Sequence, residues 1–209
     1  MNNEQSNPER PARDELILQA AFNEFLAGGF AGTSMDRIAE TAQVSKRTVY
    51  NHFPAKEILF RAVLDEFVSR ISERARAEYA LDAPLDSQLR VIGNSYASII
   101  TEPDFVRFSR VVISEAIRSP EMSGATRREQ RHLRADIIRW IRARTEDGLL
   151  AIENAERAAA QFCGPIKEVA LWPLLVGGLR PATEQQRTEA VDAAVHMFLN
   201  HYRKENKPS

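Results

Sequence analysis

Apolar residues recur at helical spacing along almost the whole chain. Hydrophobic positions three or four residues apart repeat in nearly every segment, and no run alternates with period two for long enough to form a half-buried strand. The chain should therefore be all-α. The first apolar stripe consists of Leu18, Ala21, Phe22, Phe25 and Leu26, and the glycines that follow at 28 and 29 predict the end of its helix, because glycine tolerates a left-handed conformation.

Two short helices follow the first one. Thr33 and Asp36 have the spacing of a capping box, so we expect a second helix to start there, with Ile38 and Ala39 in its core. Ser45 can cap a third helix over residues 46–52, and Pro54 should close that helix because proline disfavours helical geometry in the residue before it.

The rest of the chain predicts a bundle of longer helices. A helix over 55–79 has an apolar residue at every fourth position and is long enough to join two domains, while prolines at 84, 103 and 120 and the Asp147-Gly148 pair mark later boundaries. Two last helices, 153–176 and 184–202, have broad apolar faces; Gly164-Pro165 should kink the first, and Thr183 with Gln186 should cap the second. Such faces suit a bundle core or a subunit interface. We favour a dimer interface formed by Phe162, Ile166, Val169, Val191, Val195, Phe198 and Tyr202.

Composition narrows the class of protein. The chain has 209 residues, 44% of them hydrophobic and 27% charged, a net charge of −1, and Cys163 as its single cysteine. These values exclude a disulfide framework and fit a globular, cytoplasmic protein with no secretory leader. The longest apolar run, 169–179, is too short to span a membrane.

The most informative stretch is residues 35–59, which has the pattern of a helix-turn-helix. A helix of two turns, a turn at 42–44 and a short second helix would present one polar face to the major groove of double-stranded DNA. Residues 45–56 contain cations and no carboxylate. The exposed side of the second helix should carry Lys46, Arg47, Thr48, Tyr50, Asn51 and His52.

Side-chain chemistry assigns a role to each of these positions. Arg47 can donate two hydrogen bonds to guanine, and Thr48 can contact a thymine methyl group or a phosphate. We expect phosphates to be held by Tyr50, His52 and Lys56, which would orient the helix without reading sequence. Ser45 and Thr33 would place backbone N–H groups at helix N-termini, where anions are favoured.

At these residues the sequence resembles the TetR family of transcriptional regulators. The likeness covers residues 17–63 and rests on Gly29-Phe30, Thr33-Ser34, Ile38-Ala39, Val44-Ser45, Lys46 to Tyr50, Phe53 and Lys56 to Phe60. It implies an N-terminal helix-turn-helix domain over 1–54 and a C-terminal ligand-binding and dimerisation domain over 55–209. It also implies a homodimeric repressor released from a palindromic operator by a small-molecule effector.

Two positions depart from the family pattern. Gln43 stands where glycine is common, and a left-handed non-glycine residue costs roughly 1 kcal/mol, so the turn is expected to be tighter or differently angled. Arg47 replaces a frequent glycine and would add a contact to DNA.

We call the helix-turn-helix domain over 1–54 the head, and candidate sites outside it are less well defined. An effector pocket could be lined by Tyr96, Phe105, Phe108, Trp140, Phe162 and Trp172, although each suits the core as well. Glu115 could orient a cationic ligand, but we expect it to be exposed, and Cys163 should be a buried apolar residue rather than a redox sensor. The arginine-rich stretch 105–144 is a second candidate for a DNA face, although a solvated helix face explains it better.

No motif supports catalysis. The four histidines have no metal-ligand spacing, and the chain has neither a phosphate-binding glycine loop nor a nucleophile elbow. We therefore expect no cofactor and no metal. The alternative function is a helical small-molecule binder or an enzyme whose head no longer reads DNA, for which Gln43 is the only support.

Overall fold

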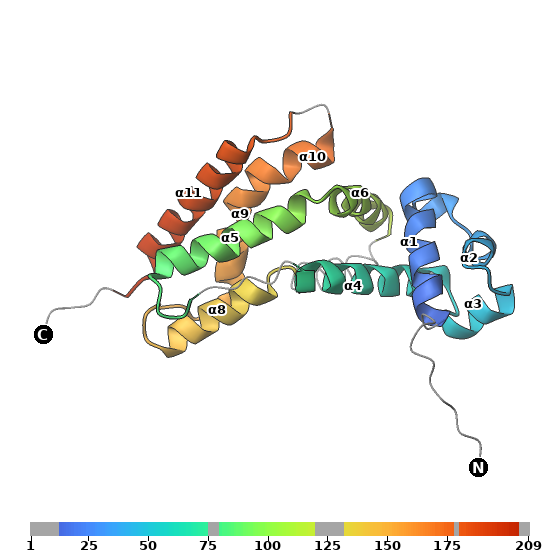
Figure 1. The fold of residues 1–209 in the computed structure, drawn as a ribbon, viewed down its shortest axis with the longest axis horizontal. Coiled ribbons are helices and arrows are strands. Elements are labelled where there is room, and N and C mark those ends of the chain that lie inside the picture. Colours follow the sequence, from blue (N-terminus) through green and yellow to red (C-terminus); the bar gives the residue numbers. More distant parts are fainter. Residues whose placement is uncertain (1–12, 75–79, 120–131, 178–179, 205–209) are drawn as a thin grey trace, which may run out of the picture. The chain divides into compact units, whose positions relative to one another are not determined.

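The computed structural model describes residues 13–74, 80–119, 132–177 and 180–204, and most of these residues are helical (Figure 1). Within these ranges the only extended pairing is an isolated bridge between Leu150 and Arg203. The predicted all-α class is confirmed. The chain divides into two compact units, Met1–Phe67 and Val68–Ser209, and each is described separately. The functional division at residue 54 stays a prediction.

The first unit packs its helices around an aromatic core. It contains α1 (Arg13–Gly32), α2 (Met35–Thr41), α3 (Lys46–His52) and the beginning of α4 (Lys56–Arg74). Phe25 meets Phe60 edge-on with ring centroids 4.9 Å apart, and Phe22 stacks on Phe67 at 4.8 Å. These contacts hold α1 against α4. The part of the predicted 55–79 helix beyond Arg74 lies outside the described helix.

The connection between α1 and α2 has the predicted left-handed glycine and differs from the prediction at the cap of α2. Gly29 adopts a φ of 67°, which kinks α1, and helical geometry resumes as far as Gly32. Ser34, not Thr33, caps α2 by accepting a hydrogen bond from the backbone N–H of Arg37. Thr33 instead lies in the interior, 4% exposed, where its hydroxyl hydrogen-bonds the carbonyls of Glu24 and Gly29. The expected capping box was wrong by one residue because sequence spacing does not show which of two adjacent hydroxyls is buried.

The turn between α2 and α3 keeps a left-handed residue without glycine. Gln43 has a φ of 55°, and its N–H bonds the carbonyl of Glu40 while the N–H of Val44 bonds that of Ala39. This is the Schellman arrangement that usually ends in glycine. The expectation of a tighter or differently angled turn is therefore wrong: the chain adopts the left-handed residue and bears its strain.

The second unit is a helical bundle. It contains α5 (Leu85–Thr101), α6 (Pro103–Arg118), α8 (Ala135–Glu146), α9 (Ala155–Ala170), α10 (Trp172–Val176) and α11 (Glu184–Tyr202). α5, α9 and α11 pack against one another, α8 lies on α9, and α6 contacts α5 and α10. Gly93 lets α5 approach α9 and α11 closely. A Cβ at this position would come within 2.8 Å of the Val191 side chain on α11 and 3.2 Å of the Phe162 ring on α9.

Helix ends in this unit match the sequence in most places. The capping box of Thr183 and Gln186 is present, and Gly148 adopts a left-handed φ after α8, as predicted. The single helix predicted over 153–176 is divided in two, because α9 continues through Pro165 to Ala170 and a break at Leu171 precedes α10; a kink at Gly164-Pro165 stays a prediction. Pro173 stands in the first turn of α10, where a missing N–H does no harm.

Candidate nucleic-acid interface

α3 is held by one buried residue and capped by one hydroxyl. Val49 is fully buried against the first unit, while Ser45 accepts a hydrogen bond from the backbone N–H of Thr48. The two hydroxyls of Ser45 and Thr48 are also 2.8 Å apart and share a hydrogen bond. The opposite face of α3 is therefore free to project its side chains into solvent.

Most of the residues predicted to face DNA from this helix are on that exposed face. Lys46, Arg47, Tyr50, Asn51 and His52 are exposed, and Tyr50 presents 49% of its surface. Within the described residues Arg47 has no hydrogen bond or ion pair. A guanidinium in this state can form a bidentate contact with guanine without first breaking an internal bond.

Two other side chains of α3 already have partners. The Lys46 ammonium lies 2.5 Å from the Asp36 carboxylate, and this hydrogen bond raises the pKa of Lys46. The ring of His52 contacts the carboxylate of Asp14 at the start of α1. The local positive charge read from residues 45–56 is thus partly offset by carboxylates from α1 and α2.

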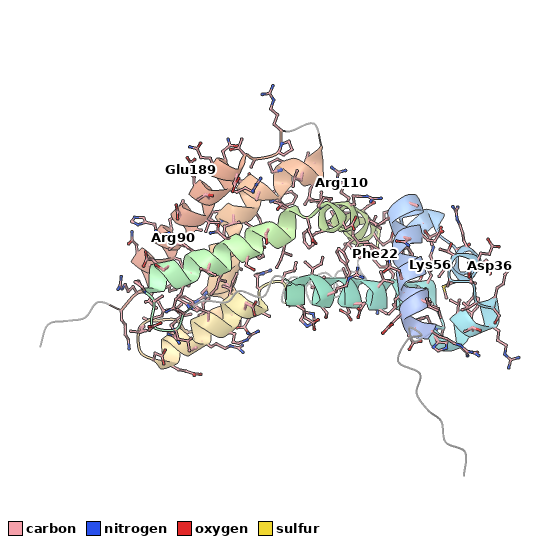
Figure 2. The ribbon with its side chains drawn as sticks, in the orientation of Figure 1. Phe22, Asp36, Lys56, Arg90, Arg110 and Glu189 are labelled. Carbon is pink, nitrogen blue, oxygen red and sulfur yellow. The ribbon has the colours of Figure 1, made fainter. Side chains whose placement is uncertain are left out.

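Lys56 serves the fold more directly than the surface. Its ammonium donates hydrogen bonds to the carbonyls of Phe30 at 2.8 Å and Thr33 at 2.9 Å, and it lies 4.3 Å from the centre of the Phe30 ring (Figure 2). These bonds fasten the α1–α2 connection to the first turn of α4. Lys56 and the buried Thr33 are therefore positioned as parts of the scaffold behind the reading helix.

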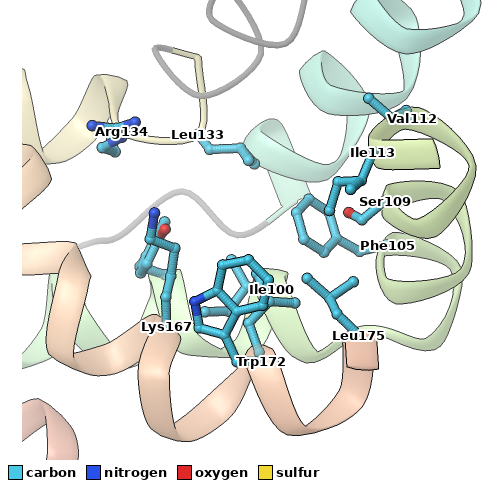
Figure 3. Close-up of a pocket in the computed structure, with 12 residues that line it drawn as sticks. Ile100, Phe105, Ser109, Val112, Ile113, Leu133, Arg134, Lys167, Trp172 and Leu175 are labelled. Carbon is cyan, nitrogen blue, oxygen red and sulfur yellow. The ribbon is translucent and has the colours of Figure 1, made fainter. Parts of the chain in front are cut away.

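The second unit contains a cavity of about 120 Å³ between α5, α6, α9 and α10 (Figure 3). Three of the predicted pocket residues line it: Tyr96, Phe105 and Trp172. The other three, Phe108, Trp140 and Phe162, are almost completely buried in the core. Trp140 donates a hydrogen bond to Gln88 at 2.8 Å, which shows a structural role for its polar atom.

Sequence reasoning missed the polar residues of this cavity. Ser109, Arg134 and Lys167 line it beside the apolar residues. Lys167 follows the buried Ile166 on α9, so its position next to an apolar stripe was the only available signal.

The side chains of Glu115 and Cys163 are both buried. Glu115 is buried rather than exposed, which corrects the expectation, and its carboxylate lies 3.3 Å from the Arg118 guanidinium. Cys163 is completely buried, and this burial raises the pKa of its thiol to about 12.

Most of the predicted dimer surface is used inside one chain. Phe162, Ile166, Val191, Val195 and Phe198 are buried, and they pack α9 and α11 together. Only Val169 and Tyr202 are partly exposed. A groove on these helices includes three of the predicted interface residues and five that sequence reasoning did not place there; it is lined by Gln161, Phe162, Pro165, Ala194, Met197, Phe198, His201 and Tyr202.

The arginines of residues 105–144 do not form a free cationic face where they are described. Ion pairs join Arg107 to Asp104, Arg118 to Glu115, Arg139 to Asp136, Arg142 to Glu156 and Arg144 to Asp147. The arginines within 120–131 lie outside the described residues. Pairing of this kind fits a solvated helix surface.

Comparison with known proteins decides the family. Residues 17–63 match the bacterial regulatory proteins of the tetR family, and residues 87–204 match the C-terminal domain of AefR-like transcriptional repressors. This chain belongs to the TetR family. It is accordingly a DNA-binding transcriptional regulator of the repressor type, and its relatives in the family are regulators, not enzymes.

Individual relatives agree with this assignment. A TetR-family regulator from Pseudomonas syringae is 38% identical, with a TM-score of 0.71 over 91% of this chain and 97% of that one. The flavonoid-responsive regulator FrrA is 26% identical, with a TM-score of 0.77 over 92% and 98%. The Escherichia coli regulator RutR is 44% identical over 57 residues, 27% of each chain. That likeness is confined to about a quarter of either protein.

None of the helices in the described ranges combines the length and the apolar character needed to cross a membrane. Those ranges also contain no group of three or more histidine, cysteine or carboxylate side chains arranged to hold a metal ion.

Proposed function

We propose that this TetR-family protein is a homodimeric repressor that binds a palindromic operator through α3 and is released by a small molecule bound in the second unit. The exposed, unpaired Arg47 on a capped, firmly packed recognition helix is the observation that carries the proposal. In the proposed complex, Arg47 reads a base. Thr48, Tyr50 and Asn51 contact the wall of the major groove and the DNA backbone. A protein–DNA interface of this kind reads sequence at base edges and gains orientation from phosphates.

Lys46 and His52 contribute less, because both already have partners. DNA phosphates compete with Asp36 for the Lys46 ammonium and with Asp14 for the His52 ring, so part of the binding free energy is offset by the loss of these contacts. Lys56 and Thr33 support the head from inside, and Ser45 fixes the first turn of α3.

Dimerisation is supported by the groove between α9 and α11. Met197 is 52% exposed at this groove, and Pro165 and Tyr202, which also line it, are only partly buried within one chain. A second copy of the same groove, related by two-fold symmetry, would bury these residues. The predicted residues Val169 and Tyr202 lie on the same two helices.

The proposal is tested by selecting binders from a random DNA pool and measuring affinity for the winner and for scrambled DNA across salt concentrations. We expect a near-palindrome bound about 10³-fold or more tighter than scrambled DNA. Arg47→Ala should relax the preference at one base position, with a loss of about 1–3 kcal/mol. Tyr50→Phe should lower affinity about equally on all sequences.

The opposite result would be weak, salt-driven binding without sequence preference. It would favour the alternative in which the second unit binds a ligand and the head does not read DNA. If Arg47→Ala lowers affinity equally for selected and scrambled DNA, Arg47 does not read a base. That result would not contradict the proposal that the protein is a DNA-binding repressor.

A further inference from the structure

The cavity of the second unit has an uneven distribution of charge. Its walls are mostly apolar, yet two cationic residues line it, Lys167 from α9 and Arg134 from the turn before α8, and no carboxylate is among its lining residues in the described part of the chain. Figure 3 shows Lys167 rising from α9 on one side and Arg134 lying across from it, at the residue before α8.

The two cations are close enough to disfavour each other. Burial lowers the pKa of Lys167, and the positive charge of Arg134 lowers it further. Lys167 has no hydrogen bond or ion pair within the described residues. A half-buried ammonium that has no counter-charge among the described residues and lies near a guanidinium is an arrangement that a bound anion would stabilise.

The remaining lining residues specify the other end of a ligand. Phe105 and Trp172 provide aromatic surfaces, and Ile100, Val112 and Leu175 are aliphatic. Ser109 is buried and forms no hydrogen bond within the described residues, so its hydroxyl is available to a ligand. The volume of about 120 Å³ is of the same order as the engineered cavity of about 150 Å³ that binds benzene.

We propose that the effector is a small organic anion with an apolar body about the size of one ring, whose anionic group lies between Arg134 and Lys167. This inference rests on the proposed function, since it names the chemical class of the molecule that would release the repressor. The ring packs against Phe105 and Trp172, and Ser109 donates to a polar atom.

Compounds with one carbon skeleton and three charges test the assignment directly. Binding to the full-length protein is measured by calorimetry for 3-phenylpropanoate, its neutral amide and the cationic 3-phenylpropylamine, and for benzoate with benzamide. We expect each carboxylate to bind about tenfold or more tighter than its amide, since a hydrogen bond to a charged group is worth more than a neutral one. The amine should bind least.

Variants then separate the charge from the cavity. Lys167→Met keeps the length of the side chain and removes its charge, so it should reduce carboxylate affinity about tenfold and leave amide affinity nearly unchanged. Arg134→Gln should act in the same direction. Lys204→Met is the matched control, because this exposed lysine follows α11 and is absent from the cavity lining, and it should change nothing. Thermal unfolding checks that each variant is folded.

Carboxylates that bind no better than their amides at about 1 mM, or a preference that survives both Lys167→Met and Arg134→Gln, would overturn the anion site. Operator release is read separately, by DNA binding with and without the carboxylate. A carboxylate that binds through Lys167 but leaves operator affinity unchanged supports the anion site and counts against the proposed release mechanism.

Discussion

At the scale of single residues, the head shows how partners change the role of a charge. The sequence places Lys46 on the exposed face of the recognition helix and marks His52 and Lys56 as phosphate contacts. The structure has each of the three bonded within the protein, to Asp36, to Asp14 and to two backbone carbonyls. A count of charge over a short stretch cannot include carboxylates that other helices contribute. Arg47, which has no such partner among the described residues, keeps the role that its chemistry suggests.

Replacing the partner of Lys46 should strengthen DNA binding. Asp36→Asn removes a carboxylate that both holds the Lys46 ammonium and repels phosphates. We therefore expect affinity for selected and scrambled DNA alike to rise about threefold to tenfold, with a salt slope steeper by about one. Titrations at several salt concentrations measure both quantities.

Asp86→Asn is the matched control for this change. It removes a carboxylate from a comparable exposed ion pair, with Arg90 in the second unit (Figure 2), and should leave DNA binding unaltered. Unchanged affinity and slope for Asp36→Asn would mean that Lys46 does not approach DNA.

At the scale of elements, periodicity identified most helices and left their ends less certain. Apolar spacing and end signals placed α3 and α11 correctly, because Ser45 and Thr183 cap these helices and Pro54 follows α3. They misplaced the α2 cap and the break after α9. In both cases the deciding contact, the burial of the Thr33 hydroxyl or the geometry at Leu171, depends on packing that short-range sequence does not encode.

Glycine at the α2–α3 turn should stabilise the head. Gln43 holds a φ of 55°, a region that costs an ordinary residue roughly 1–2 kcal/mol and glycine almost nothing. Because glycine also loses more conformational freedom on folding, we expect Gln43→Gly to raise the free energy of unfolding by about 0.5–1 kcal/mol. Urea unfolding measures the change. Gln43→Ala keeps the strain and should give no gain; an equal gain from both variants would assign the effect to loss of the glutamine side chain.

At the scale of the whole molecule, the all-α class and the family followed from sequence, whereas the use of the apolar faces did not. Broad stripes on the last two helices fit a subunit interface and a bundle core equally well. The structure shows that residues such as Ile166 and Val195 form the core, and that the groove beside Met197 is what a single chain leaves open. The cationic side of the cavity could not be predicted either, because Lys167 lies on α9 whereas Arg134 lies in the turn before α8.

A charge placed in that groove should separate the proposed dimer. Met197→Glu would bury an unpaired carboxylate at the interface, so we expect light scattering to show a shift from dimer to monomer at a given concentration. Affinity for the palindrome should fall, while affinity for a half-site stays the same. Ile117→Glu, at a residue of α6 that is 78% exposed and absent from the groove, should remain dimeric. A Met197→Glu protein of unchanged mass would move the interface elsewhere.

The rate at which the Cys163 thiol is alkylated can report how often the second unit opens. Because the side chain is completely enclosed and its pKa is raised to about 12, an alkylating reagent near neutral pH meets almost no thiolate in the closed bundle. Alkylation then proceeds only through molecules in which α9 has separated from its neighbours. The alkylation rate therefore measures how often the second unit opens. A ligand that fills the cavity beside α9 should lower this rate in proportion to its occupancy of the cavity.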